Sequence, residues 1–297
     1  MKKTLAMMTA AVMVAGALAG CGSSSSTPAA TTAAATEAAT TAAATEAATT
    51  EAAGDTAAAA EGTVKTPSGK FTVGFDQEFP PMGFVGDDGQ FTGFDLDLAK
   101  EVASRLGLEF VPQPINWDAK DMELDSGNID CIWNGFTMQG REDDYTWVGP
   151  YMANNQVFVV TADSDIASKV DLAGKAVEVQ KDSSGLAALQ GEAELSASFG
   201  SMTEVADYNT ALMDLESGAC DAVCMDSIVA GYQIKSSGKD MKILDDTLSA
   251  EEYGIGFKKG EDELAKAVHD TLMEMKDDGT IAKISNDWFG SDVFTLK

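Results

Sequence analysis

From about residue 70 onward, the hydrophobic and polar positions of the chain alternate between two spacings. Short apolar runs predict β-strands at 70–76, 108–114, 129–133, 155–162, 175–180, 220–226, 241–244 and 253–259. Segments with apolar residues at helical spacing predict helices at 94–107, 119–127, 183–194, 208–218, 228–238 and, as a pair, within 262–290. This alternation predicts an α/β fold built on a parallel sheet.

The candidate functional residues directly follow the predicted strands, or the turns after them. Ligands of open α/β sheets bind beyond the carboxyl ends of the strands. We interpret Asn134-Gly135 as a turn that ends the 129–133 strand and directs polar groups toward a cleft. The candidates are Asp76, Phe79, Trp117, Asn134, Gly135, Thr137, Arg141, Ser183, Ser184 and Asp226.

These residue types together fit a small zwitterion. A guanidinium such as that of Arg141 binds a carboxylate through two hydrogen bonds, and the N–H groups at a helix start add to it. A carboxylate such as that of Asp226 binds an ammonium, while aromatic rings cover the rest of the molecule. Asp76 and Glu78 favour a polar or cationic ligand by charge complementarity, with the alternative that Glu78 faces the solvent.

Each of these residues also has a purely structural interpretation. Arg141 could form a surface ion pair with Glu142 or Asp143. Asp226 could be the N-cap of the helix that follows it. The large aromatic side chains of Phe79 and Trp117 could belong to the core.

The first 20 residues are typical of an export signal. Two lysines precede an apolar stretch, and small residues precede Cys21, which predicts a signal peptide over 1–20. The sequence "LAGC" resembles the bacterial lipobox, which implies cleavage before Cys21 and diacylation (palmitate-type lipid) of its sulfur. An ordinary secretory signal with a chance cysteine is the alternative. The mature protein is expected to be extracytoplasmic and lipid-anchored to the cell membrane.

Residues 21–62 have the composition of a tether. The unit "TTAAATEAA" occurs at 31–39 and again at 40–48, and the segment has no aromatic and no large aliphatic residue. Such a segment buries too little apolar surface to offset its chain entropy. We expect a disordered Ala/Thr/Glu linker between the membrane and a folded part that begins near residue 63.

Charge and cysteine content narrow the function classes. The formal net charge is −28 at pH 7, which argues against nucleic acid as a partner. Cys131, Cys220 and Cys224 have no neighbouring histidine, so we expect free buried thiols and no zinc site. No metal and no cofactor are expected.

Five motifs in order along the chain resemble one known family. They are "GFDQEFPPMGF", "TGFDLDLAKEVASRLG", "SGNIDCIWNGFTMQGRED", "VQKDSSGLAAL" and "GACDAVCMDSIVAGY". From about 70 to 289 the chain is similar to the extracellular solute-binding proteins of family 3, the amino-acid-binding components of bacterial ABC importers. The resemblance implies a two-lobe, type II periplasmic-binding-protein fold that closes like a clamshell on two hinge strands. Lobe 1 would comprise 63–154 and 252–297, and lobe 2 would comprise 155–251.

The resemblance also implies roles for the candidate residues. Arg141, Thr137 and the N–H groups at Ser183 and Ser184 would bind the α-carboxylate, and Asp226 with backbone carbonyls near Asn134 would bind the α-ammonium. Phe79 and Trp117 would flank the ligand side chain, and Asp76 would face its far end. The implied protein is a monomeric, non-enzymatic binder of a free L-amino acid that delivers it to permease subunits.

Two other functions use the same architecture. Some dehydratases share it, but an enzyme needs a placed acid and base, and the only histidine, His269, falls off the apolar stripe of its predicted helix. A sensory binding module is the other alternative.

Overall fold

The computed structural model describes Thr66 and residues 68–297. The predicted signal peptide at 1–20, the lipidation site Cys21 and the tether at 21–62 lie outside the described residues. The α-helices are α1 (Phe94–Leu106), α2 (Lys120–Ser126), α3 (Ser184–Gly191), α4 (Ala193–Ser198), α5 (Tyr208–Ser217), α6 (Ser227–Ser237), α7 (Asp262–Asp277) and α8 (Thr280–Phe289). Short 3-10 helices cover Trp117–Ala119 and Lys169–Leu172.

Eight strands form one sheet in the order β5-β1-β6-β11-β7-β10-β8-β9. Two of them are long, namely β7 (Tyr145–Thr161) and β11 (Met241–Lys258), and they pair antiparallel along most of their length. The other six are β1 (Lys70–Phe75), β5 (Glu109–Pro114), β6 (Cys131–Thr137), β8 (Ala176–Gln180), β9 (Ser201–Val205) and β10 (Ala222–Asp226). A separate small antiparallel sheet contains β2 (Glu78–Phe79), β3 (Gly83–Val85) and β4 (Phe91–Thr92).

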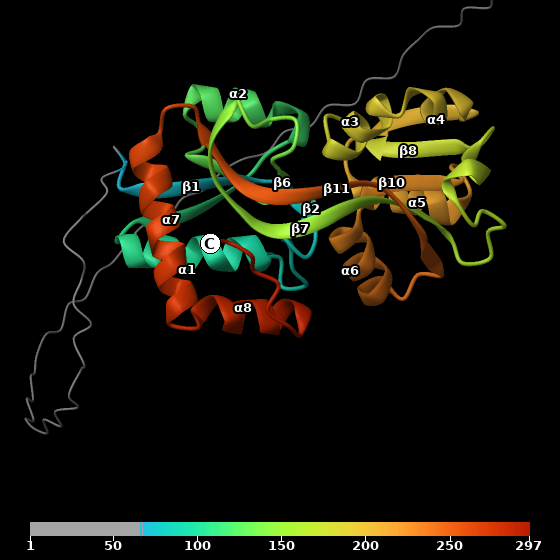
Figure 1. Ribbon diagram of the computed structural model, residues 1–297. Coiled ribbons are helices and arrows are strands. Elements are labelled where there is room, and N and C mark those ends of the chain that lie inside the picture. Colours follow the sequence, from blue (N-terminus) through green and yellow to red (C-terminus); the bar gives the residue numbers. More distant parts are fainter. Residues whose placement is uncertain (1–65, 67) are drawn as a thin grey trace, which may run out of the picture. The chain divides into compact units, whose positions relative to one another are not determined.

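The two long strands connect two halves of the large sheet (Figure 1). The first half contains β5, β1 and β6, which are parallel, and β6 pairs with β11 over Tyr253–Phe257. The second half contains β10, β8 and β9, which are also parallel, and β10 pairs with β7 over Gln156–Val159. We call the region between the halves, around residues 249–253 of β11, the junction.

The carboxyl ends of the strands from both halves meet at the junction. The last residue of β6, Thr137, lies opposite Tyr253 of β11. The last residue of β10, Asp226, lies opposite Gln156 of β7, which in turn lies opposite Ser249 of β11. Four residues of strand separate the two positions, a distance of about 13 Å. Ligands of open α/β sheets bind at the carboxyl ends of the strands, so the junction between the two halves of the sheet is the candidate position for a small-molecule site.

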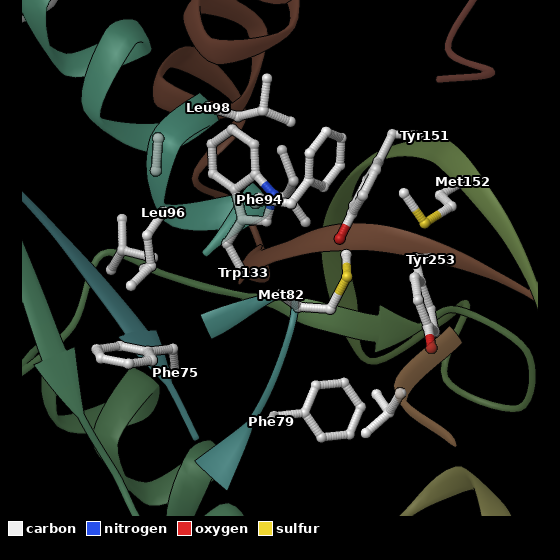
Figure 2. Close-up of a cluster of buried hydrophobic side chains, with 14 of the residues drawn as sticks. Phe75, Phe79, Met82, Phe94, Leu96, Leu98, Trp133, Tyr151, Met152 and Tyr253 are labelled. Atoms are coloured by element: carbon white, nitrogen blue, oxygen red, sulfur yellow. The ribbon is translucent and has the colours of Figure 1, made fainter. Parts of the chain in front are cut away.

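Helices cover both faces of each half. In Figure 1, α1 and α2 lie on opposite faces of the first half, and α3 and α5 lie on opposite faces of the second. The apolar stripe of α1 is buried through residues such as Leu98 and Val102, and the helix ends at Gly107, whose φ of 70° is the left-handed conformation that glycine adopts at helix ends. Figure 2 shows the core beneath α1, where Trp133, Phe94 and Tyr151 are fully buried.

The structure corrects three predictions about strands. Asn134-Gly135 is not a turn that ends a strand, because β6 continues to Thr137. The pairing with β11 is interrupted instead, since its register shifts between Gly254 and Gly256, and Gly135 has a φ of 57°. This bulge still redirects the backbone toward the junction. The predicted strands at 241–244 and 253–259 are parts of the single strand β11, and 155–162 is only the end of β7.

The sheet is mixed, whereas the sequence predicts a parallel sheet. Strands β7 and β11 run antiparallel to their neighbours in both halves. The helix predicted over 183–194 is divided into α3 and α4, and β9 and the small sheet were not predicted. The division into lobes at 154/155 and 251/252 stays a prediction.

Candidate functional site

The candidate site lies at the junction, where one polar network connects the two halves. Thr137 Oγ1 of β6 lies 3.2 Å from Ser184 Oγ at the start of α3. Gln156 Nε2 of β7 donates to the same Ser184 oxygen at 3.1 Å. The structure therefore brings together Thr137 and Ser184, two residues at which the family resemblance implies contacts to the ligand carboxylate.

Arg141 adds an available guanidinium to this end. Its Nη1 donates to the carbonyl of Thr137 at 3.2 Å and its Nη2 to the carbonyl of Asp182 at 3.4 Å. Its Cζ lies 5.1 Å from the centroid of the Phe136 ring. Among the described residues, no carboxylate lies within 4.0 Å of Arg141, so the predicted alternative of an ion pair with Glu142 or Asp143 is not formed. A guanidinium with only neutral partners retains its charge for an anion.

The start of α3 reinforces the positive character of this end. Ser183 is the N-cap residue, and its Oγ accepts the N–H of Leu186 at 3.1 Å. The cap fixes the first turn, whose N–H groups carry the positive end of the helix dipole. Together with Arg141, the α3 start is suited to a carboxylate.

Asp226 lies at the opposite, negatively charged end of the site. Its Oδ1 accepts hydrogen bonds from Asn154 Nδ2 and from the Tyr253 hydroxyl, both at 2.7 Å, and its Oδ2 accepts a weaker one from the Tyr208 hydroxyl at 3.4 Å. Burial, followed by the nearby carboxylate of Glu251, raises the pKa of Asp226 well above its usual value. Asp226 occupies the N-cap position of α6 but makes no capping hydrogen bond, so its side chain serves the junction instead.

Asp76 directly follows β1 and makes hydrogen bonds to both halves of the sheet. Its Oδ1 accepts the N–H of Glu78 at 2.8 Å, and its Oδ2 accepts from Gln180 Nε2 of the second half at 2.7 Å. Burial raises the pKa of Asp76 to about 6, against the lowering effect of these two hydrogen bonds. The N–H of Asp76 donates to Asn134 Oδ1 at 3.0 Å, so two predicted site residues fix one another.

The bulge in β6 is held by a buried carboxylate of α1. Gly135 N–H donates to Asp95 Oδ2 at 2.7 Å, and the Tyr151 hydroxyl donates to the same oxygen at 2.8 Å. A Cβ at Gly135 would lie 2.9 Å from the Phe79 ring and 3.1 Å from the Tyr253 ring. The lack of a side chain at Gly135 therefore lets both rings approach its backbone; Phe79 and Tyr253 are labelled in Figure 2.

The two predicted aromatic residues differ in position. Phe79 is buried, and its ring centroid lies 5.9 Å from that of Tyr208, whose hydroxyl reaches Asp226. Trp117 is half-buried and packs edge-on against Phe136 at 5.5 Å. Phe79 is thus both a core residue and a wall near Asp226, whereas Trp117 lies toward the surface.

A groove opens beside Asp76 between the two halves. Its volume is about 690 Å³. One cation, Lys181, lines it, and it is paired with Asp118 at 2.6 Å. The acidic side chains that line the groove are Asp76, Glu78, Asp118, Glu123, Glu204 and Asp207. The side of the site next to Asp76 is therefore strongly acidic.

Several residues of the junction were not predicted. Glu251, Asn154 and Gln156 lie on the long strands and belong to the polar network. Because 245–252 reads as a loop between two apolar runs, its pattern gave no reason to expect a buried glutamate. Asn154 directly precedes the predicted 155–162 strand, and Gln156 is the second residue of that strand. Only their hydrogen-bond partners on other strands indicate a role for them.

Among the described residues, no group of three or more His, Cys, Asp or Glu side chains is placed to hold a metal ion. Cys131, Cys220 and Cys224 are free and buried, which confirms the prediction for these thiols. The helices of 68–297 include none of the length and apolar character that a membrane span requires.

Comparisons with known proteins relate this chain to one family. The model of the bacterial extracellular solute-binding proteins, family 3, matches residues 71–291. The chain is 32% identical over 231 residues to the L-cystine-binding protein TcyJ of Escherichia coli (strain K12), covering 76% of this chain and 84% of that protein.

Solved structures show the same fold. A substrate-binding protein of an ABC uptake transporter from Streptococcus pneumoniae, with bound histidine, is 34% identical and superposes with a TM-score of 0.74 over 77% of this chain and 96% of that one. The protein Tv2483 bound to L-arginine is 28% identical, with a TM-score of 0.73 over 77% and 93%. These likenesses confirm the predicted type II periplasmic-binding-protein fold class. The chain therefore belongs to the bacterial extracellular solute-binding proteins, family 3.

Proposed function

We propose that the protein binds a free L-amino acid at the junction and delivers it to the permease subunits of an ABC importer. The observation that carries this proposal is the opposition of charges across the site. Arg141, without a carboxylate partner among the described residues, lies with Thr137 and the α3 start at one end, and Asp226 lies at the other. An α-amino acid has the complementary carboxylate and ammonium.

The ligand would carry a cationic or polar side chain. Asp76 and the acidic groove lie where a side chain would extend beyond the α-carbon, and the groove's one lysine is already paired. Relatives and neighbours of this chain bind L-cystine, histidine and L-arginine, each of which has a second polar or basic group. We infer that Asp76 faces such a group and that Phe79 and Trp117 cover the connecting stem.

Binding would close two lobes around the ligand. We assign lobe 1 to 63–154 and 252–297 and lobe 2 to 155–251, so that β7 and β11 supply the hinge strands. Contacts across the junction, such as Gln180 with Asp76 and Thr137 with Ser184, support a closed arrangement. A ligand that contacts both lobes stabilises closure, because those contacts exist together only in the closed form.

The location follows from the family and the N-terminal sequence. Relatives in the family are extracytoplasmic, and we propose anchoring through lipid on Cys21 with residues 21–62 as the tether. The relatives are binding proteins, which supports a non-enzymatic role over a dehydratase-like one. We expect a monomer, because each chain carries both ends of the site.

A thermal-shift screen tests the proposal. Purified protein without residues 1–20 is heated with each of the twenty amino acids and with L-cystine. We expect an increase in melting temperature with L-arginine, L-histidine or L-cystine and none with L-glutamate, because binding to the folded state stabilises it. A flat response to every compound would contradict the proposed function.

A further inference from the structure

A second buried carboxylate lies next to Asp226. Glu251 of β11 is only 5% exposed. Asn154 Nδ2 donates to Asp226 Oδ1 at 2.7 Å and to Glu251 Oε1 at 2.6 Å, so one amide nitrogen holds both carboxyl groups. Gln156 Nε2 donates to the same Glu251 oxygen at 2.9 Å. Asp226 and Glu251 therefore form a close pair inside the junction.

No protein cation neutralises this pair. Within the part of the chain that the structure describes, no Lys, Arg or His nitrogen lies within 4.0 Å of either carboxylate. The titratable groups around it are Tyr208 of α5, Tyr253 of β11 and Cys224 of β10, and burial raises the pKa of each, so all are neutral near pH 7. The side chains of β7 that contact the pair are the uncharged amides of Asn154 and Gln156, and α3 has no titratable residue. Two adjacent buried carboxylates require a positive charge between them.

One hydrogen-bond acceptor next to the pair has no donor in the described part of the chain. Gln156 Oε1 is buried and has no partner among the described residues, although the same amide bridges Glu251 and Ser184. Asp226 is turned away from the N–H groups of α6 that it could cap. Buried polar atoms are normally paired, so this arrangement favours a ligand that brings a positive charge and several N–H donors.

We propose that Glu251 completes the ammonium site, so that Asp226 and Glu251 together hold one positive charge, which is a proton in the free protein and the ammonium of the ligand in the complex. This inference rests on the proposed function. On binding, the ammonium enters, and the shared proton leaves one carboxyl group for the buffer. The pair with its proton and the pair with the ammonium both have a net charge of −1, so the buried site keeps a constant charge.

Proton release makes the affinity depend on pH in a defined direction. If one proton leaves for each ligand bound, the association constant rises up to tenfold for each pH unit while the pair is protonated in the free protein. A site in which Asp226 alone is the counter-charge to the ammonium, and is ionised in the free protein as well, releases no proton.

Titration calorimetry in several buffers measures the proton directly. L-Arginine, L-histidine and L-cystine are titrated at pH 6.5 in phosphate, PIPES and imidazole, whose ionisation enthalpies differ. L-Arginine is the cleanest probe, because its guanidinium stays protonated. We expect the observed enthalpy to vary with the buffer's ionisation enthalpy, with a slope of more than half a proton released. Binding with a slope of zero overturns the inference alone, whereas no binding heat with any of the three probes removes the proposed function as well.

Two variants assign the proton to the pair. Glu251→Gln keeps the shape and the acceptor for Asn154, and we expect it to bind with a buffer slope near zero and an affinity that changes less than twofold between pH 6 and 7. Glu252→Gln is the matched control, because Glu252 is the next residue of β11 and is exposed. It should keep the wild-type slope. Proton release by Glu251→Gln equal to that of the wild type would overturn the inference.

Discussion

Lys120 of α2 and Asp182 form an ion pair that connects the two halves of the sheet beside the site. The side chain of Lys120 is only 2% exposed and that of Asp182 is 52% exposed. Lys120 Nζ also lies 3.3 Å from the carbonyl oxygen of Asp182, to which Arg141 donates as well. This pair was not predicted from the sequence, and it places a contact between the halves next to the end that we assign to the carboxylate.

Removing the Lys120 charge should weaken closure. Lys120→Met keeps the buried stem and loses the contact to Asp182, which exists only when the halves are together, so the open form gains population. We expect a three- to tenfold weaker affinity for the amino acid that the thermal-shift screen identifies. Small-angle scattering of the ligand-free variant should give a larger radius of gyration than the wild type.

The control for this prediction is a second ion pair across the halves. Lys181 Nζ lies 2.6 Å from Asp118 Oδ2, and the two side chains are 56% and 38% exposed. Exposed pairs often contribute about 0.4 kcal/mol or less, which is about twofold in affinity, so Lys181→Met should change the affinity at most about twofold. Equal effects of the two substitutions would argue against a specific role for Lys120.

The sequence predicts the elements well but not their partners. Helical spacing places α1, α5 and α6 within a residue or two, because their apolar stripes and terminal glycines are local signals. The bulge at Gly135 depends on Asp95 from α1 and on two aromatic rings, none of which is adjacent in sequence. Likewise, Glu251 becomes a site residue only through Asn154 on another strand. Contacts that depend on tertiary packing leave no periodic signal.

Substitution of Gly135 should damage the site and the fold together. Gly135→Ala forces a residue with a Cβ into a φ of 57° and places that atom 2.9 Å from the Phe79 ring. We expect a loss of about 2–4 kcal/mol in the free energy of unfolding, measured by urea titration.

The control variant Gly89→Ala separates the backbone strain of a positive φ from the steric clash of the added Cβ. Gly89 has a φ of 75°, and nothing lies within 4 Å of its added Cβ. It should lose only about 1 kcal/mol. If the two variants are equally stable, the close packing of Phe79 around Gly135 is wrong.

Asp95 should make the ligand-free protein less stable as pH rises. Burial raises its pKa from 3.8 to about 7, despite hydrogen bonds from Tyr151 and Gly135 that lower it. Between these values the folded state binds more protons than the unfolded state, so the free energy of unfolding falls with increasing pH, by about 4 kcal/mol in total. In Asp95→Asn the free energy of unfolding should not show this decrease with pH, because the amide does not titrate. Urea unfolding at pH 5, 6, 7 and 8 should show that the free energy of unfolding of the variant, relative to that of the wild type, increases with pH.

The control is a carboxyl group that titrates outside this range. Hydrogen bonds from Thr280 and Arg105 lower the pKa of Asp278 to about 2. Asp278→Asn should therefore follow the wild-type pH dependence from pH 5 to 8. A constant difference between Asp95→Asn and the wild type over the same range would show that Asp95 does not titrate there.

Cys21 should decide whether the protein stays on the membrane. The "LAGC" sequence motivates the substitution Cys21→Ser, which removes the sulfur that the lipid would modify. In a lipidating bacterial host, we expect the variant in the soluble extracytoplasmic fraction and the wild type in the membrane fraction. A variant that still sediments with membranes would exclude Cys21 as the anchor.

The central claim is that Arg141 and Asp226 bind the carboxylate and the ammonium of one amino acid. Titration calorimetry tests this claim most directly. L-Arginine, L-histidine and L-cystine are titrated into the wild type, Arg141→Ala and Asp226→Asn. Arg141→Ala leaves the ligand carboxylate without its cation, and Asp226→Asn leaves the ammonium without one of its two carboxylates. Loss of one partner of a buried charge pair costs roughly 2–5 kcal/mol. We predict at least thirtyfold weaker binding for both variants, while Arg105→Ala, which removes a surface ion pair to Glu101 and Asp278, binds like the wild type. Binding by Arg141→Ala or Asp226→Asn within a few-fold of the wild type would contradict the account.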